Sequence, residues 1–337
     1  MNRKLISASI MVGIVLSTMM SLFAGCGKRE VPEGTLLSIF YTSDVRGKLE
    51  GCGCKRNGGG ITKRSAKLAA ARGEDPNIIY CDSGNFLSGQ SYNDETGGMI
   101  SVKAYNHMGA NVVNVSEREL ALGLDPYKTA KASSDFDYIS ANITANGARV
   151  ADEYVIKDFK NSKVAFVGLC GTKNVMKYDS TSLPAGVVIE DPMVTARKIL
   201  PSLTNKADVI IVLSTCGDEM DSLLADNFEF VNLIIGGRSF RANEDKPWVV
   251  GNTRIVRASR DGKTMGRMDM VFGPENKIKT YSPQKITMET SDPSDTEMLA
   301  VVREFLPDFV DNPQDGVRIK KQASVSSATS ASEEIKK

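Results

Sequence analysis

Short apolar, β-rich runs alternate with amphipathic helical stretches along most of this chain, and this alternation restricts the fold more than any other feature. The apolar runs predict strands at residues 36–42, 77–81, 112–115, 138–141, 163–169, 209–214 and 231–235. The amphipathic stretches predict helices at residues 61–72, 99–108, 192–203 and 219–225. Such alternation favours an α/β domain with its strands inside and its helices outside.

The alternation stops after Trp248, and the remaining chain has a different character. Its apolar runs indicate a meander of strands, at residues 253–257, 265–272 and 277–286. A last helix is expected at residues 296–305. The segment at the end is rich in Ser, Ala, Lys and Glu and has no apolar period, which predicts a disordered tail.

These patterns predict one folded domain with distinct ends. We expect the domain to cover residues 36–286, preceded by a short polar tether over residues 26–35. A C-terminal helix and extension would follow over residues 287–321, and the disordered tail over residues 322–337. No internal repeat is visible. Hydrophobic residues make up 41% of the chain, which is enough to fill the core of one domain of this size.

The first residues have the pattern of an export signal. Arg3 and Lys4 precede an apolar stretch, and residues 22–26 (LFAGC) resemble a bacterial lipobox. This predicts removal of residues 1–25 and lipidation of Cys26, which would anchor the protein to a membrane. An ordinary secretory signal and an uncleaved anchor remain as alternatives. Gly27, not aspartate, follows the cysteine, so we expect a periplasm-facing protein of the cell envelope, at the outer membrane.

Charge and histidine content exclude several classes of function. The chain has 42 basic and 41 acidic residues, which gives no electrostatic reason to expect a nucleic-acid partner. His107 is the only histidine, so a His-rich metal site is excluded and a single imidazole is left for acid–base chemistry. Because it lies near the end of the helix expected at residues 99–108, His107 is expected at the surface or near a helix C-terminus rather than in catalysis.

Short segments that follow several of the predicted strands carry a family resemblance. In order along the chain they are residues 40–47 (FYTSDVRG), 59–64 (GGITKR), 82–85 (DSGN), 113–119 (VNVSERE), 213–217 (LSTCG) and 236–240 (GGRSF). This series resembles the motifs of the 5′-nucleotidase and UDP-sugar hydrolase-like branch of the calcineurin-like metallophosphoesterases. The resemblance implies the family's four-layer α/β/β/α sandwich, here as a single domain.

The same resemblance argues against the family's chemistry. Its enzymes hold two divalent ions through Asp, Asn and His side chains, and metal-bound hydroxide attacks phosphorus. Carried over by position, Asp44 is retained and Asn85 replaces the bridging aspartate. The remaining ligand positions are occupied by Arg46, Glu117, Arg118, Thr215, Arg238 and Phe240. Arginine does not coordinate metals, so the two-metal site is not expected, and Asp44 and Asn85 would be its vestiges.

The arginines at these positions have two interpretations. Arg46, Arg118 and Arg238 could neutralise Asp44 and Glu117 through bidentate ion pairs. The favoured interpretation is that such pairs hold a non-catalytic site closed, because buried charges must be paired whatever the function. The other is an arginine-lined pocket that binds phosphate, sulfate or a nucleotide without hydrolysing it.

The cysteines allow three interpretations. Besides Cys26, they follow or end predicted strands, at Cys52, Cys54, Cys81, Cys170 and Cys216. The Cys-Gly-Cys element resembles that of an envelope subgroup of nucleotidase-like proteins. The thiols could form disulfides or pack as small apolar groups. They could instead form a redox site, in which Cys52 and Cys54 exchange with Cys216, or a thiolate metal site.

Together these features predict an envelope lipoprotein that carries a metallophosphoesterase-like pseudoenzyme domain. A non-hydrolytic binding or thiol-redox role is expected, with a small anion or a redox protein as the partner. No cofactor is assigned, although a thiolate-bound metal is one reading of the cysteines. The alternative function is a residual phosphoesterase that acts on nucleotides or other phosphomonoesters through a single divalent ion on Asp44 and Asn85.

Overall fold

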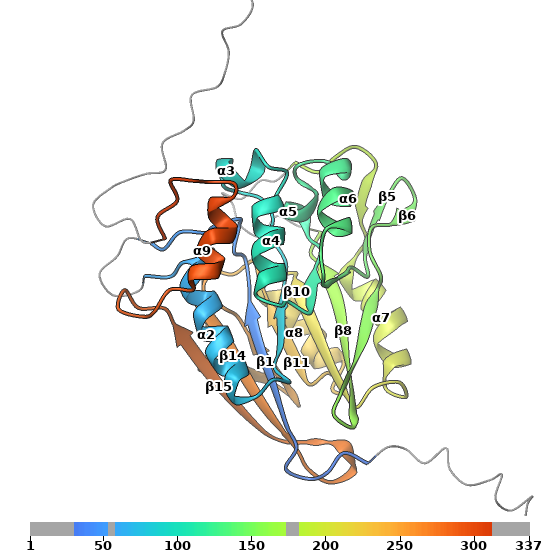
Figure 1. Ribbon diagram of the computed structural model, residues 1–337. Helices are drawn as coiled ribbons and strands as arrows, with labels where there is room; N and C mark the ends of the chain where they lie inside the picture. Colours follow the sequence, from blue (N-terminus) through green and yellow to red (C-terminus); the bar gives the residue numbers. More distant parts are fainter. Residues whose placement is uncertain (1–29, 53–57, 173–181, 312–337) are drawn as a thin grey trace, which may run out of the picture.

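The computed structural model describes residues 30–52, 58–172 and 182–311 (Figure 1). The predicted signal segment, Cys26, Cys54 and the predicted tail at residues 322–337 lie outside the described residues. Within the described part, no helix has both the length and the apolar character needed to cross a bilayer.

The first sheet has six strands in the order β15-β14-β1-β2-β3-β4. Strands β1 to β4 run parallel to their neighbours, and β14 and β15 add an antiparallel hairpin next to β1. The bounds are β1 Leu36–Thr42, β2 Ile79–Asp82, β3 Val112–Asn114, β4 Asp137–Ile139, β14 Thr264–Phe272 and β15 Ile278–Thr287.

The second sheet also has six strands, in the order β12-β13-β11-β10-β8-β7. Its central strands are parallel, and β7 and β12 are antiparallel at the edges. The bounds are β7 Tyr154–Phe159, β8 Ser162–Cys170, β10 Val209–Thr215, β11 Leu233–Gly236, β12 Trp248–Val250 and β13 Thr253–Val256. A small third sheet consists of β5 Ile143–Ala145, β6 Ala148–Arg149 and β9 Val187–Ile189.

The meander predicted after Trp248 is therefore wrong in one respect. Strand β13 pairs in parallel with β11 of the second sheet, and only β14 and β15 form an antiparallel hairpin in the first sheet. Consecutive apolar runs do not reveal which sheet a strand joins, because either sheet offers an apolar face.

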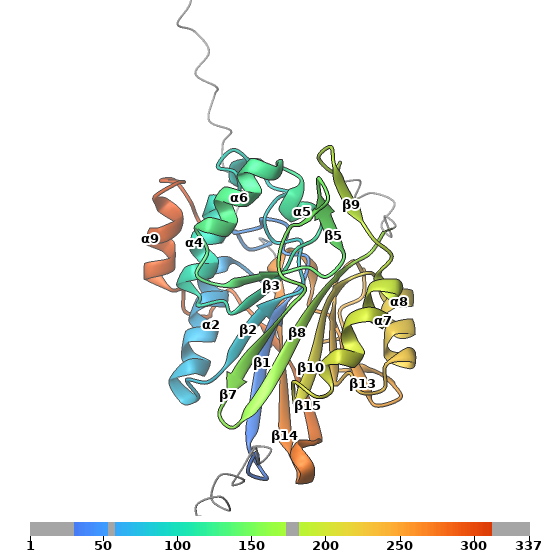
Figure 2. The same ribbon diagram turned by 90° about the vertical axis from the view of Figure 1, so that its right-hand side faces the viewer.

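Helices cover the outer face of each sheet, as Figure 2 shows. On the first sheet lie α2 (Ile61–Glu74), α4 (Met99–His107) and α9 (Thr296–Arg303), and α9 packs against both of the others. On the second lie α7 (Pro192–Leu203) and α8 (Asp218–Asn227). Shorter helices complete the first half of the fold, at α3 Ser91–Asp94, α5 Glu117–Leu120 and α6 Leu124–Ala132. The predicted four-layer α/β/β/α sandwich is confirmed.

Strand β1 shows how its residues produce this layering. Leu37, Ile39 and Tyr41 face the second sheet and belong to the core between the sheets. Phe40 points the other way, into the core beneath the helices of the first sheet. Because successive side chains of a strand alternate between faces, a strand buried on both faces is apolar throughout. The continuous apolar runs in the sequence thus reflect two stacked sheets, each covered on both sides.

Candidate functional site

The candidate site lies where the strands of both sheets end. The loops after β1 and β2 carry Asp44 and Asn85, and the loop after β11 of the other sheet carries Arg238. All three have a positive φ, of 49°, 65° and 56° respectively. Non-glycine residues seldom adopt this conformation, and such strain is typical of functional sites. The chain turns sharply at each of these positions and directs polar groups toward a common centre.

Asp44 lies at this centre and is almost fully buried. Its Oδ1 accepts a hydrogen bond from Asn85 Nδ2 at 2.8 Å, and its Oδ2 accepts one from the Arg238 backbone N–H at 2.6 Å. A Cβ atom at Gly237 would lie 3.3 Å from both carboxylate oxygens. Both oxygens of Asp44 are therefore bonded to groups of the protein itself.

Arg238 supplies the positive charge of the centre. Its guanidinium forms an ion pair with the Glu117 carboxylate and donates a hydrogen bond to the Gly171 carbonyl at 3.3 Å. The side chain is only 5% exposed. Burial lowers the pKa of the guanidinium, and the negative charge of Asp44 raises it. An arginine remains protonated in such surroundings, so it neutralises the carboxylates at this edge.

Glu119 organises the backbone of the same site, although the sequence motifs predict no role for it. Its fully buried carboxylate accepts hydrogen bonds from the backbone N–H groups of Asn85, Phe86, Leu87 and Ser116. It also accepts one from the Ser116 hydroxyl. The bond from the Ser116 backbone N–H forms a capping box at the start of α5, together with the Glu119 backbone N–H, which donates to the Ser116 side chain. The S-x-x-E spacing of residues 116–119 is a signal that could have identified this pair.

Arg46 and Arg118 each have a partner outside the Asp44–Glu117 pair. Arg46 Nε donates to Asp261 Oδ1 at 2.9 Å and forms an ion pair with that carboxylate. Arg118 Nη1 donates to the Ser88 carbonyl at 3.3 Å. The two arginines are nevertheless close, because Arg118 Nη1 and Arg46 Cβ lie 2.7 Å and 3.3 Å from the point where a Cβ at Gly89 would stand.

A buried polar network lies beneath the site. Asp82 accepts hydrogen bonds from the Thr42 hydroxyl, the Tyr105 hydroxyl and the Gly84 backbone N–H. Burial raises the pKa of Asp82 to about 7. Gly84 has a φ of +111°, and a Cβ there would meet the Asn114 carbonyl at 2.9 Å, so only glycine fits this turn.

The cysteines do not gather into one redox centre among the described residues. Cys52 is disulfide-bonded, whereas Cys81, Cys170 and Cys216 are free and buried. The three free thiols belong to three different apolar cores. Burial raises the pKa of each, to about 12 for Cys170.

These environments argue against the predicted chemistry of two cysteines. Cys216 does not suit thiol exchange, because the thiolate is the reactive species and burial suppresses it. A disulfide sulfur is no thiolate, so Cys52 does not suit the predicted thiolate metal site. The described residues contain no group of three or more His, Cys, Asp or Glu side chains placed to hold a metal ion.

His107 lies away from the site, at the end of α4. Its Nε2 is 3.0 Å from Asp295 Oδ2, and Asp295 is the N-cap residue of α9. The imidazole therefore connects two helices of the outer layer, and it touches none of the residues at the strand ends.

Comparison with known proteins finds similar proteins among the phosphoesterases. No protein-family model matches the chain. The sequence is 24% identical over 285 residues to a trifunctional nucleotide phosphoesterase of Bacillus subtilis, covering 72% of this chain and 18% of that protein. The chain spans at most about half of the length of such relatives, among them the mouse 5′-nucleotidase.

Solved structures show the same fold. A 5′-nucleotidase precursor of Thermus thermophilus superposes with a TM-score of 0.72 at 22% identity, covering 81% of this chain and 59% of the other. A calcineurin-like phosphoesterase of Bacillus subtilis superposes with a TM-score of 0.69 at 17% identity, covering 81% of this chain and 97% of the other.

Proposed function

We propose that this protein, whose homologues and structural neighbours are 5′-nucleotidases and related calcineurin-like metallophosphoesterases, keeps their phosphoesterase-like domain without their hydrolytic chemistry. The resemblance predicted from the sequence motifs is confirmed at the level of the family. The proposed role is that of a non-hydrolytic, anion-binding module, attached to the cell envelope through a lipid on Cys26.

The observation that carries the proposal is the occupation of the carboxylates by the protein's own groups. Divalent ions in such sites need open carboxylate or imidazole ligands. Asp44 already accepts from Asn85 and from the Arg238 backbone, and the Arg238 guanidinium pairs with Glu117. Asn85 Oδ1, its one oxygen that could bind a metal, accepts from the Ser116 hydroxyl at 2.6 Å. These residues do not fit the two-metal centre of the family.

The positive charge of an arginine, in place of metal ions, also explains how the buried carboxylates of the site are stabilised. Two buried carboxylates without a compensating cation would be strongly unfavourable. The guanidinium of Arg238 supplies that charge, but it cannot bind or activate a water molecule as a metal would. The site therefore keeps its charge balance and lacks a means of generating hydroxide.

The rim of the site supports binding of an anion. Arg46 and Arg118 are half-buried and lie on the same loop surface around Gly89. Phe240 is 68% exposed, and the Arg260 guanidinium lies 4.8 Å from the centre of its ring. Guanidinium groups favour phosphate and carboxylate ligands, and an exposed aromatic ring can stack on a planar group. A nucleotide combines both chemistries.

Hydrolysis is the first test. With 5′-AMP or p-nitrophenyl phosphate and added Mn²⁺, we expect no phosphate release above that of an Asp44→Asn variant. Addition of Mn²⁺ should also leave the thermal midpoint unchanged, because an ion that binds only the folded state would raise it. Metal-dependent release that disappears in Asp44→Asn would overturn the proposal in favour of the residual phosphoesterase.

Anion binding is tested separately by calorimetry with AMP. Arg118→Gln should weaken binding, whereas Arg197→Gln, which changes an exposed arginine of α7 away from this rim, serves as the matched control. Equal affinities in the wild type and in Arg118→Gln would exclude this rim as the binding surface. Intact mass of the exported protein tests the anchor, because acyl chains should be present on Cys26 and absent after Cys26→Ser.

A further inference from the structure

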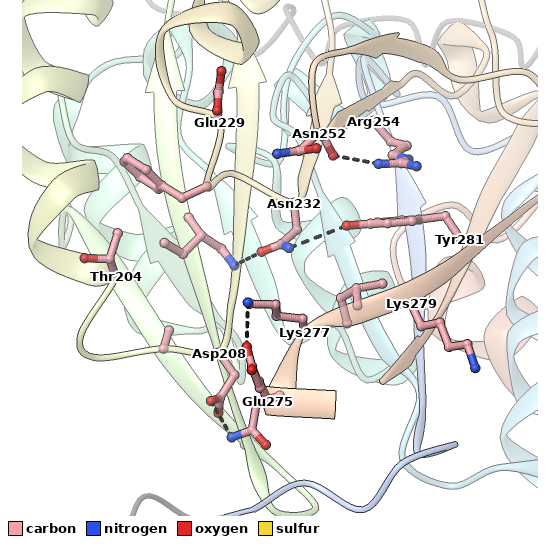
Figure 3. A pocket seen from close by; sticks show the side chains of 15 residues that line it. Thr204, Asp208, Glu229, Asn232, Asn252, Arg254, Glu275, Lys277, Lys279 and Tyr281 are labelled. Atoms are coloured by element: carbon pink, nitrogen blue, oxygen red, sulfur yellow. Dashed lines mark hydrogen bonds and ion pairs between the residues drawn. The ribbon is translucent and has the colours of Figure 1, made fainter. Parts of the chain in front are cut away.

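A cavity of about 580 Å³ lies at the edge opposite the Asp44 site. It is bounded by the starts of β10, β11 and β13 in the second sheet and by β15 of the first sheet (Figure 3). Its size is within the usual range for sites that bind small molecules. The family motifs do not reach this edge, because they all follow the other ends of the strands.

Arg254 lines this cavity, and its guanidinium is held in position by two contacts. Its guanidinium lies over the Tyr281 ring, 4.0 Å from the ring centre, and Nη1 donates to the Asn252 carbonyl at 2.7 Å. Within the described residues it has no carboxylate partner. The stacking and the backbone contact hold the guanidinium in place and leave its remaining N–H groups for a ligand.

The floor of the cavity is also fixed by hydrogen bonds. Asn232 Oδ1 accepts from the Ile210 backbone N–H at 2.9 Å, and Asn232 Nδ2 donates to the Tyr281 hydroxyl at 3.5 Å. These contacts orient Tyr281, on which Arg254 stacks. The arrangement therefore exists before any ligand binds, which lowers the cost of ordering the site.

Two of the three acidic side chains that line the cavity already have partners within the protein. Asp208 accepts from Asn276 Nδ2 and from the Lys163 backbone N–H, each at 2.9 Å, and Glu275 pairs with Lys277 at 2.6 Å. Glu229 lies apart from Lys279 in Figure 3. The cationic groups of Arg254 and Lys279 therefore remain for an anion at this wall of the cavity.

The start of the described chain lies at the same edge. The Val31 backbone N–H donates to Asn276 Oδ1 at 2.8 Å, and Asn276 lines the cavity. Figure 1 shows this start next to the turn between β14 and β15. Four residues lie between Cys26 and Val31, so the five chain steps that join their Cα atoms limit the distance between them to about 18 Å. A lipid on Cys26, which belongs to the function proposed above, would therefore keep the cavity near a membrane surface.

We propose that this cavity binds the phosphate group of an anionic phospholipid. Arg254 would bind the phosphate oxygens in bidentate fashion, with Lys279 as a second cation. The apolar side chains of Phe230, Ile210 and Ile278 would contact the glycerol and the first acyl carbons. The opposite edge, with Asp44, would then face away from the membrane.

The test compares a lipid probe with a soluble phosphate ester. Calorimetry on the full chain in detergent uses dihexanoyl phosphatidylglycerol and glycerol 3-phosphate as the two probes. We expect both to bind the wild type, the lipid more tightly, and Arg254→Gln to weaken both by at least about tenfold. Arg241→Gln is the matched control and should bind as the wild type does. Phe230→Ser should weaken binding of the lipid probe only.

Each outcome decides between sources of the phosphate. Binding of glycerol 3-phosphate at least as tight as that of the lipid, both lost in Arg254→Gln, would support phosphate binding and replace the lipid by a soluble ester. Absence of binding in the wild type, or equal affinity in a folded Arg254→Gln variant, would overturn the proposal. Intact mass of Cys26 is measured independently, so a missing anchor is distinguished from a cavity that binds no phosphate.

Discussion

The two ends of the sandwich use arginine in opposite ways. At the carboxyl ends of the strands, Arg238 is buried and paired with Glu117, and its backbone bonds Asp44. At the opposite end, Arg254 is held by Tyr281 and the Asn252 carbonyl and has no carboxylate partner among the described residues. The first arginine completes a closed charge balance, whereas the second presents charge to a cavity.

This contrast teaches where to look for function in a domain related to enzymes. A buried ion pair is weak evidence of function, because the protein needs it to offset the cost of burying its carboxylates. A positioned arginine that no carboxylate neutralises has no such structural explanation. The two situations differ in what replacement of each arginine should do to the free energy of unfolding.

The largest effect is expected from removing the buried cation. Arg238→Met leaves the Glu117 carboxylate buried and unpaired, which should lower the free energy of unfolding by about 3 kcal/mol or more in urea titrations. Arg254→Met should cost only about 1 kcal/mol or less, because it removes one half-buried cation–π contact and leaves no buried carboxylate unpaired. The double variant Arg238→Met, Glu117→Gln should recover much of the loss. Similar losses for both single variants would contradict the contrast between the two ends.

A second effect concerns the carboxylate that holds the loops of the Asp44 site. Glu119→Ala leaves several buried backbone N–H groups without acceptors, so we expect a loss of about 2 to 3 kcal/mol. Glu119→Gln keeps one acceptor oxygen and should lose less. Chemical unfolding of both variants measures the difference, and an equal loss would mean that the hydrogen bonds contribute little beyond packing.

The buried network around Asp82 should make the free energy of unfolding depend on pH. Burial raises the pKa of Asp82 from 3.8 to about 7, so the folded state holds a proton that the unfolded state releases between these values. The free energy of unfolding should therefore decrease as pH rises from about 4 to about 7, by up to about 1.4 kcal/mol per pH unit. Asp221, with a pKa raised to about 6, acts in the same direction.

Asp82→Asn provides the control for this dependence. The amide does not titrate, so the slope contributed by Asp82 should disappear while that of Asp221 remains. Unfolding curves at several pH values measure the slope directly. An unchanged slope in Asp82→Asn would show that other groups are responsible.

A smaller effect is expected at the outer helices, away from both ends of the sandwich. His107→Gln removes a partly exposed contact with Asp295 and should cost less than about 1 kcal/mol. It should leave AMP binding and phosphatidylglycerol binding unchanged. A change in either affinity would mean that the helix layer influences the sites at the strand ends.

The smallest effect is expected from thiol reagents on the folded protein. Cys81, Cys170 and Cys216 are buried, so iodoacetamide should modify them only after unfolding. Intact mass before and after denaturation counts the protected thiols. Rapid modification of Cys216 in the native protein would restore the redox interpretation of that residue.

Much of the fold could be predicted, because its information is local. The runs that became β1, β8 and β10 are mostly apolar, and the amphipathic stretches at α2 and α7 begin and end close to their predicted bounds. The sheet that each strand would join was less predictable, and β13 was placed wrongly for that reason. The short strands β5, β6 and β9 are partly exposed, so they carry little apolar signal.

The chemical groups available at the strand ends follow from the sequence alone: Asp44, Asn85, and arginines at positions where the resembled family has metal ligands. How these groups pair with one another depends on the packing of the folded chain. Arg46 pairs with Asp261, which lies more than 200 residues away, and Glu117 pairs with Arg238. The cavity around Arg254 likewise joins residues of both sheets. Each side chain is given by its own position in the sequence, but charge pairing depends on which distant loops the packed strands bring together.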